Sequence, residues 1–223
     1  MIKTQRRRGR TKTRAKREAA TEQRILEAAR TVFLHRGTDG ARMQEIAKEA
    51  GVNQALLHYY FRSKERLSTA VLQQVASRIF PALVQTLGAD ISLDEKVERL
   101  MTIYLDTLSS NLFVPGYLIS ELHHGPDRVR ELLTGVMGTD PSNVGPMVLK
   151  QLEKQINERV QEGTMRPIKP QQFVMNLISL CVFPFAARPM MSIVFGMDDA
   201  AFMRFIDQRK KELPDFFRRA IRP

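Results

Sequence analysis

The stretch that decides the fold is residues 46–67, which read IAKEAGVNQALLHYYFRSKERL. It holds the end of one short helical segment, about 41–50, and the whole of a second, about 54–61. Gly51 lies between them and can take the positive φ of a sharp turn, while Asn53 is a favourable N-cap for the second segment. Two short helices around a glycine turn predict a helix-turn-helix.

The two segments have distinct inner and outer residues. Ile46, Ala47, Leu57 and Phe61 are expected to pack with residues 32–33 of an upstream helix as a small core. The outer face of the second segment then consists of Gln54, Ala55, His58 and Tyr59. A helix with such a face is narrow enough to enter the major groove of DNA, where glutamine can pair with adenine.

The rest of the chain repeats apolar residues at the three-to-four spacing of helices, without the alternation of strands. One helix starts at Glu18 and is stopped by Gly37, and a loop covers 138–145. The other expected helices cover about residues 64–88, 93–111, 115–122, 126–136, 147–162, 173–197 and 198–220. We predict an all-α fold with a basic arm (1–17, disordered), a three-helix helix-turn-helix DNA-binding domain (18–66) and a second helical domain (67–223).

The net charge of +11 is concentrated in one short segment. Residues 3–17 contain nine cations and no acid, so the other residues together carry only +2. The segment has too few apolar residues to join a core, and it lacks the apolar region of a secretory signal. Because single-sign blocks bind phosphate through counterion release, we expect Arg6–Arg17 to lie along flanking phosphates or in the minor groove. The alternative is a solvated tail.

Residues 173–197 are the most apolar stretch, but they do not read as a membrane span. Asn176, Pro184 and Arg188 interrupt them, and the uncharged apolar part, about 177–187, is too short to cross roughly 30 Å of hydrocarbon. We expect this helix to be buried by other protein. The single cysteine, Cys181, lies within it and is expected to be an inert buried thiol.

Three parts of the sequence resemble the TetR/AcrR family of transcriptional regulators: residues 46–53, residues 57–67, and the upstream Ile25-Leu26-Glu27-Ala28-Ala29 with Phe33 and Gly37. The resemblance covers about residues 21–72. It implies a dimer whose paired recognition helices enter successive major grooves of a palindromic operator. It also implies a C-terminal helical domain that holds a small-molecule pocket and the dimer interface.

The resemblance gives roles to individual residues. Gln54, Ala55 and Tyr59 match positions of base or thymine-methyl contacts, and Tyr60 and Lys64 match positions of phosphate contacts. Three positions depart from the family pattern: Arg42 replaces threonine or serine, Leu56 a small polar residue, and His58 a tyrosine. The predicted DNA-binding set is Arg42, Asn53, Gln54, Ala55, His58, Tyr59, Tyr60 and Lys64. The alternative for the outward residues is a solvated helix face, and for Leu56 a place in the core.

The second half offers candidates for binding a largely apolar small-molecule effector. Tyrosine combines an apolar body with a polar tip, methionine adapts to varied shapes, and nine of the eleven methionines lie from Met101 onward. The candidates are Met101, Tyr104, Phe113, Tyr117 and His123. Ordinary core packing is the alternative for each of them.

Neither a metal site nor catalytic chemistry is predicted. The adjacent His123 and His124 point about 100° apart on a helix, and Glu121 with His124 would supply only two ligands. The sequence has no glycine loop for phosphate and no Ser/His/Asp or Cys/His set placed together. We therefore predict no cofactor and no enzyme activity.

The dimer is expected to form through residues 147–162 and 173–187, two helices per subunit in a four-helix bundle, with Leu180 inside the interface. These features together predict a ligand-responsive, homodimeric repressor that binds double-stranded DNA, without a membrane partner, in the cytoplasm at the bacterial nucleoid. The alternative is a non-specific or architectural nucleic-acid-binding protein that acts through the basic arm.

Overall fold

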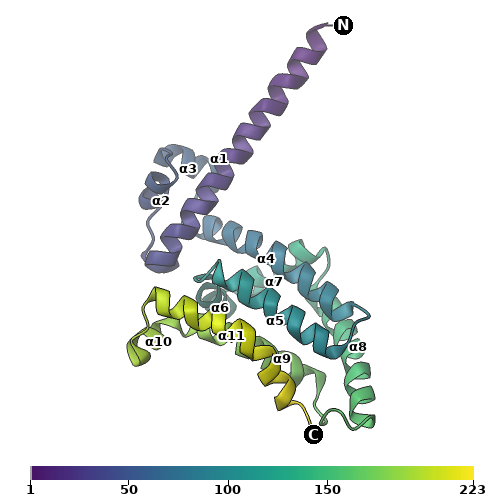
Figure 1. Ribbon diagram of the computed structural model, residues 1–223. Helices are drawn as coiled ribbons and strands as arrows, with labels where there is room; N and C mark the ends of the chain where they lie inside the picture. The colour runs from purple at the N-terminus through teal and green to yellow at the C-terminus, as the bar shows by residue number, and fades with distance from the viewer. Residues whose placement is uncertain (1) are drawn as a thin grey trace. The chain divides into compact units, whose positions relative to one another are not determined.

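The computed structural model describes the backbone of residues 2–223 and the side chains of residues 15–123 and 125–223. The described residues contain no strand, which confirms the predicted all-α class. The chain divides into two compact units, residues 1–72 and residues 73–223. The helices, labelled in Figure 1, are α1 (Ile2–Gly40), α2 (Met43–Glu49), α3 (Gln54–Phe61), α4 (Lys64–Gly88), α5 (Leu93–Ser109), α6 (Val114–His124), α7 (Pro126–Met137), α8 (Pro141–Gln161), α9 (Pro170–Ala186), α10 (Arg188–Phe195) and α11 (Asp199–Ala220).

In the first unit α2 packs against both α1 and α3 (Figure 1). Its core is largely apolar: Phe33, Ile46 and Leu57 are completely buried, and Ala47 and Phe61 nearly so. These are the residues predicted to form this core, although the predicted member Val32 is only half-buried. Because α3 packs against this core through one side only, its outer side is left exposed to solvent.

The turn between α2 and α3 closes as predicted around Gly51, which has φ +62°. The N–H of Gly51 donates to the Lys48 carbonyl at 3.1 Å, and the N–H of Val52 donates to the Ala47 carbonyl at 3.0 Å. This pair of bonds satisfies the free carbonyls at the end of α2 and is the Schellman arrangement. At the start of α3 the Asn53 Oδ1 accepts from the N–H of Leu56 at 2.7 Å.

We expect Gly51→Ala to lower the free energy of unfolding by about 1–2 kcal/mol, because an L-residue is strained at this positive φ. No atom lies within 4 Å of the Cβ that alanine would add, so the loss comes from the backbone alone. Gly135, inside α7 and equally unobstructed, is the matched control. Gly135→Ala should raise the stability by about 0.5–1 kcal/mol in the same urea titration. Equal effects of the two changes would contradict the role given to the Gly51 turn.

Residues 2–17 differ from the prediction of a disordered arm, because α1 extends back through them. Arginine and lysine are good helix formers, and a helix already nucleated by its packed part can propagate along them. At its other end the helix is interrupted at Gly37, which has φ +67° and ψ 170°, as its position in the sequence predicted. The side chains of residues 2–14 lie outside the described residues, so the expected phosphate contacts of the arm remain a prediction.

In the second unit α5 lies between α9 and α11 (Figure 1). Phe173 meets Phe217 edge-on with ring centroids 5.2 Å apart, which joins α9 to α11 across the core. The helix expected from Met147 begins six residues earlier, so the predicted loop over 138–145 is wrong in its second half. Asp140 caps α8 by accepting from the N–H of Ser142 at 2.8 Å, and a proline follows at the first helical position.

The apolar stretch 173–197 forms two helices rather than one. α9 and α10 meet at 63° around Ala187, where the next helix starts with Pro189 in its first turn. Proline has no N–H to continue the α9 ladder, and this explains the break. Among the described residues no single helix has the length and apolar character of a membrane span; only the bent α9–α10 pair reaches that length and composition.

Lys96, on α5, is completely buried, and its Nζ donates to the Leu87 carbonyl at 2.6 Å, in the last turn of α4. A cation at the C-terminus of a helix is favourable. Burial nevertheless lowers the pKa of Lys96 below its ordinary 10.5, an effect that Asp90 partly opposes. The ammonium therefore fastens the end of α4 to α5 at the expense of its own hydration.

This lowered pKa predicts a pH dependence of stability. Within the range between the native pKa of Lys96 and 10.5 the unfolded chain binds more protons, so the native state gains stability as the pH rises. We expect the wild-type free energy of unfolding, measured in urea at pH 7.5 and pH 10, to rise relative to that of Lys96→Met. A constant difference between the two proteins would contradict this.

Candidate nucleic-acid interface

The exposed face of α3 is the most distinctive surface of the first unit. Gln54, Ala55, His58 and Tyr59 are all exposed, as predicted, while Leu57 and Phe61 are buried beneath them. Tyr59 has 72% of its surface exposed. A tyrosine left this open contributes little to folding, and its ring and hydroxyl are free to contact a partner. Leu56 is also exposed rather than part of the core.

His58 is held by the backbone of its own helix end. Its Nδ1 lies 3.1 Å from the carbonyl oxygen of Arg62. The N–H of Arg62 in turn donates to the His58 carbonyl at 2.9 Å. Arg62 has φ +51°, the single positive value at a non-glycine residue in the described chain. No sequence pattern predicted this arrangement, because it depends on the conformation in which α3 ends.

Tyr60 and Lys64, predicted to contact phosphate, both make internal hydrogen bonds. The Tyr60 hydroxyl donates to the Glu18 carbonyl of α1 at 3.3 Å, and the Lys64 Nζ donates to the Asp39 carbonyl at 2.8 Å. Lys64 keeps two further N–H groups that a phosphate can accept from. Tyr60 has only one proton to donate, so its role as a phosphate donor would require the bond to Glu18 to be exchanged. Both residues also brace α1 and its end against α3 and α4.

Asn53 and Arg42 lie at the N-caps of α3 and α2 and are both exposed. The side-chain oxygen of Asn53 accepts the capping hydrogen bond from Leu56, which leaves the N–H groups of its side-chain amide free to donate. The backbone N–H of Arg42 donates to the Glu45 carboxylate at 3.4 Å, so its guanidinium is not needed for the cap. Either residue is positioned to donate to phosphate near a helix N-terminus.

The five effector candidates do not gather in one cavity of the structure. Met101 is buried in the core, and Tyr104 lines a cavity of about 30 Å³ with Phe173 and Leu177. Burial raises the pKa of the Tyr104 phenol, so it stays protonated. Phe113 and Tyr117 are half-buried near the start of α6. His123 is exposed, with its Nδ1 2.7 Å from the Ile119 carbonyl.

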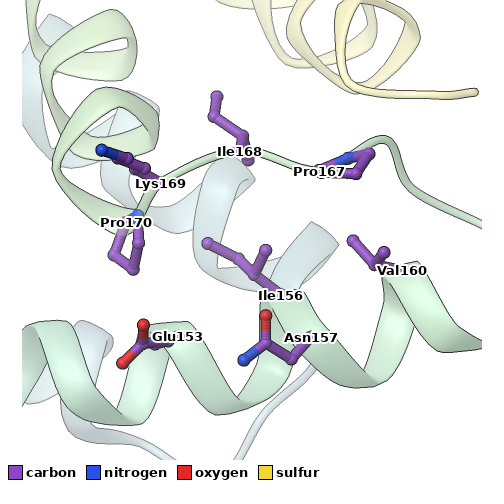
Figure 2. Close-up of a pocket in the computed structure, with 8 residues that line it drawn as sticks. All are labelled: Glu153, Ile156, Asn157, Val160, Pro167, Ile168, Lys169 and Pro170. Carbon is purple, nitrogen blue, oxygen red and sulfur yellow. The ribbon is translucent and has the colours of Figure 1, made fainter.

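Two larger clefts of the second unit were not predicted. One, of about 690 Å³, lies between α4 and α5 and includes Glu95, Glu98 and Arg99. The other, of about 320 Å³, lies between α8 and the segment 167–170. Figure 2 shows Ile156 and Val160 projecting from α8 towards this segment. Each cleft is lined by two segments that are close in the sequence, 82–89 with 95–103 and 153–160 with 167–170, but its size depends on side-chain packing that no local pattern encodes.

No group of three or more potential metal ligands occurs among the residues that the structure describes. Cys181 is completely buried, as the sequence predicted, and burial raises the pKa of its thiol to about 12. A thiol with so high a pKa is neutral at physiological pH and is a poor nucleophile.

Known proteins resemble this chain in the region that contains α2 and α3. Residues 25–71 match the family described as bacterial regulatory proteins, tetR family. The chain is 24% identical over 183 residues to the probable HTH-type transcriptional regulator YttP of Bacillus subtilis, covering 81% of this chain and 84% of that protein. It is 28% identical over 169 residues to the HTH-type transcriptional regulator RutR of Escherichia coli K12, covering 74% and 76%.

Solved structures show the same fold. The ketosteroid transcriptional regulator KstR2 of Mycobacterium tuberculosis matches with a TM-score of 0.63 at 16% identity, over 91% of this chain and 95% of that one. HlyIIR, a hemolysin II transcriptional regulator, matches with a TM-score of 0.58 at 22% identity, over 92% and 99%. These relatives are transcriptional regulators rather than enzymes. The glycine turn and the exposed α3 both lie within the matched residues 25–71, and these similarities support a TetR-family transcriptional regulator.

Proposed function

We propose that the protein is a ligand-responsive homodimeric repressor that binds a palindromic operator through two copies of α3. The observation that carries the proposal is the exposed α3 face, on which Gln54, Ala55, His58 and Tyr59 lie over a fully buried apolar layer. Such a face can enter a major groove and contact base edges. Arg42, Asn53, Tyr60 and Lys64 would supply the surrounding contacts to phosphate. The repressor would act in the cytoplasm, at the bacterial nucleoid.

A dimer is supported by apolar side chains that the second unit leaves uncovered. On α9 Met175 and Phe183 are 59% and 60% exposed, and on α8 Met147 is also exposed. Exposed apolar residues along neighbouring helices are typical of an interface between subunits. Leu180 is a poor interface candidate, contrary to its predicted place, because it packs against the core of its own chain and its carbonyl accepts from Arg209. We therefore place Phe183 at the centre of the proposed interface.

The effector is proposed to be a largely apolar small molecule bound in the second unit. Met101, Tyr104, Phe113, Tyr117 and His123 remain the proposed contacts, of which Tyr104 already lines a cavity. An effector can shift the equilibrium only if it binds one conformation better than the other. The proposed change is in the spacing of the two α3 helices, away from about 34–36 Å, one helical turn of DNA.

The experiment that tests this function is selection of bound duplexes from a random DNA pool with the full chain at about physiological salt. We expect an enriched palindrome whose half-sites are about one helical turn apart. Recovery without enrichment would overturn the proposal in favour of non-specific binding. The recovered operator then provides the probe for every binding measurement below.

The nine cations of residues 3–17 support a second candidate, non-specific binding through the arm, and they predict a salt effect. Each neutralised phosphate contributes about 0.9 to the slope of log Kd against log salt concentration. A chain starting at residue 18 should therefore show a slope smaller by several units, measured by fluorescence anisotropy on the recovered operator. A chain with Lys210 and Lys211 changed to glutamine is the control and should keep the slope. An unchanged slope after truncation would reduce the arm to a solvated tail.

A further inference from the structure

We propose that His58 is a base-specificity residue that accepts a hydrogen bond from an exocyclic amino group, so that it selects cytosine or adenine at one position of each half-site. This inference rests on the proposed function, since it requires α3 to lie in the major groove. It assigns both a direction of hydrogen bonding and a class of base to one side chain.

The backbone at the end of α3 holds the imidazole ring of His58 in place. Nδ1 of His58 is 3.1 Å from the Arg62 carbonyl oxygen, and the Arg62 N–H donates to the His58 carbonyl at 2.9 Å. These two bonds join the same pair of residues through both backbone and side chain. The positive φ of Arg62 turns the chain at the end of α3, immediately before its carbonyl. The imidazole is therefore oriented before any DNA is bound, although the residue is exposed.

The partner of Nδ1 determines which nitrogen of the His58 ring carries the proton. A carbonyl oxygen only accepts hydrogen bonds, so Nδ1 must be the nitrogen that carries the proton. In a neutral imidazole the other nitrogen, Nε2, then carries a lone pair and can only accept. Nε2 lies across the ring from Nδ1, away from the backbone that holds it. His58 thus presents a fixed acceptor on the outer face of α3.

An acceptor at Nε2 limits the DNA groups that His58 can bind to hydrogen-bond donors. In the major groove the donors are the N4 amino group of cytosine and the N6 amino group of adenine. Guanine presents O6 and N7, and the polar group of thymine there is O4, all acceptors that would face the Nε2 lone pair. Phosphate oxygens are acceptors as well, so a phosphate contact does not fit this nitrogen. Cytosine and adenine are the bases that complement His58.

The test is a parallel selection from the random pool at pH 8 with the wild-type chain and with His58→Phe. The wild-type palindrome should contain one symmetric base pair that becomes unselective in the variant. Gln54→Ala is the matched control on the same face and should relax a different position. Circular dichroism checks that each variant keeps its helix content.

A second measurement uses the wild-type protein and changes only the DNA. At the symmetric position, adenine is replaced by purine, or cytosine by pyrimidin-2-one, which removes the amino group and keeps the ring. Loss of one hydrogen bond per half-site should weaken wild-type binding about 3–10-fold for each and leave His58→Phe binding unchanged. An identical palindrome from both proteins, or equal weakening of both proteins when the amino group is removed, would overturn the assignment alone. Failure of the wild-type chain to enrich any palindrome would overturn the proposed function together with it.

Discussion

Tyr59→Ala is expected to weaken binding to the recovered operator by about 30-fold or more while leaving the fold and its stability unchanged. Tyr59 is 72% exposed and meets Tyr60 edge-on with ring centroids 5.5 Å apart, so its removal opens no cavity. A base contact is worth about 1–3 kcal/mol, and a symmetric dimer loses two of them. Binding is measured by fluorescence anisotropy, and stability by urea denaturation of the same preparations.

Phe216→Ala is the matched control for this change. Phe216 is also an exposed aromatic residue, 59% open, but it lies on α11 in the second unit. Its removal should leave operator binding within about twofold of the wild type. If Tyr59→Ala also bound within twofold, α3 would not be the surface that reads the operator. A large loss of stability in Tyr59→Ala would instead mean that the ring is needed for folding.

Phe183→Glu is expected to convert the dimer into monomers and to weaken operator binding by about 100-fold or more. A carboxylate at the centre of an apolar interface would lose its hydration without a partner, which is costly. A dimer binds its second half-site at a high effective concentration, an advantage of about 10²–10⁴ that monomers lack. Light scattering after gel filtration gives the mass, and anisotropy gives the Kd.

The control for the interface is Leu122→Glu. Leu122 is a 49%-exposed apolar residue on α6, outside the proposed interface, so this variant should remain dimeric and bind as the wild type does. A fully dimeric Phe183→Glu protein with normal affinity would exclude this face of α9 as the interface. Dissociation of both variants would show that any added charge, rather than its position, causes the loss.

Local signals were sufficient to predict the helix-turn-helix. Gly51 and Asn53 act through their own backbone and the next few residues, and the small core beneath α3 follows from apolar spacing within one domain. The outer residues of α3 were predictable for the same reason, since a short helix with one buried side leaves the other side exposed. The surface proposed to bind DNA could therefore be predicted from the sequence.

Contacts between distant segments could not be derived in this way. The bonds from Tyr60 to Glu18 and from Lys64 to Asp39 depend on how α1 packs against α3 and α4, which no local pattern encodes. The same is true of the cavity beside Tyr104, which residues of α4, α5 and α9 line together. The early start of α8 is different, because Asp140 followed by proline is a local signal of a helix N-terminus that apolar spacing alone does not detect.

The break between α9 and α10 shows where composition misleads. Residues 173–197 are mostly apolar, so periodicity gave no reason to divide them, yet a new helix with Pro189 in its first turn begins at Arg188, at 63° to α9. The arm shows the opposite case, in which few apolar residues predicted disorder but continuity with a packed helix extends α1. In both segments the neighbouring structure, rather than composition, determines the conformation.

The most direct test of DNA recognition by α3 is dimethyl sulfate protection of the recovered operator. The reagent methylates guanine N7 in the major groove and adenine N3 in the minor groove. It therefore shows which of the two grooves the protein covers. We expect protection of guanine N7 in two patches about 34–36 Å apart, absent with Tyr59→Ala. Protection confined to adenine N3, or no protected guanine N7 within the half-sites, would contradict recognition by α3.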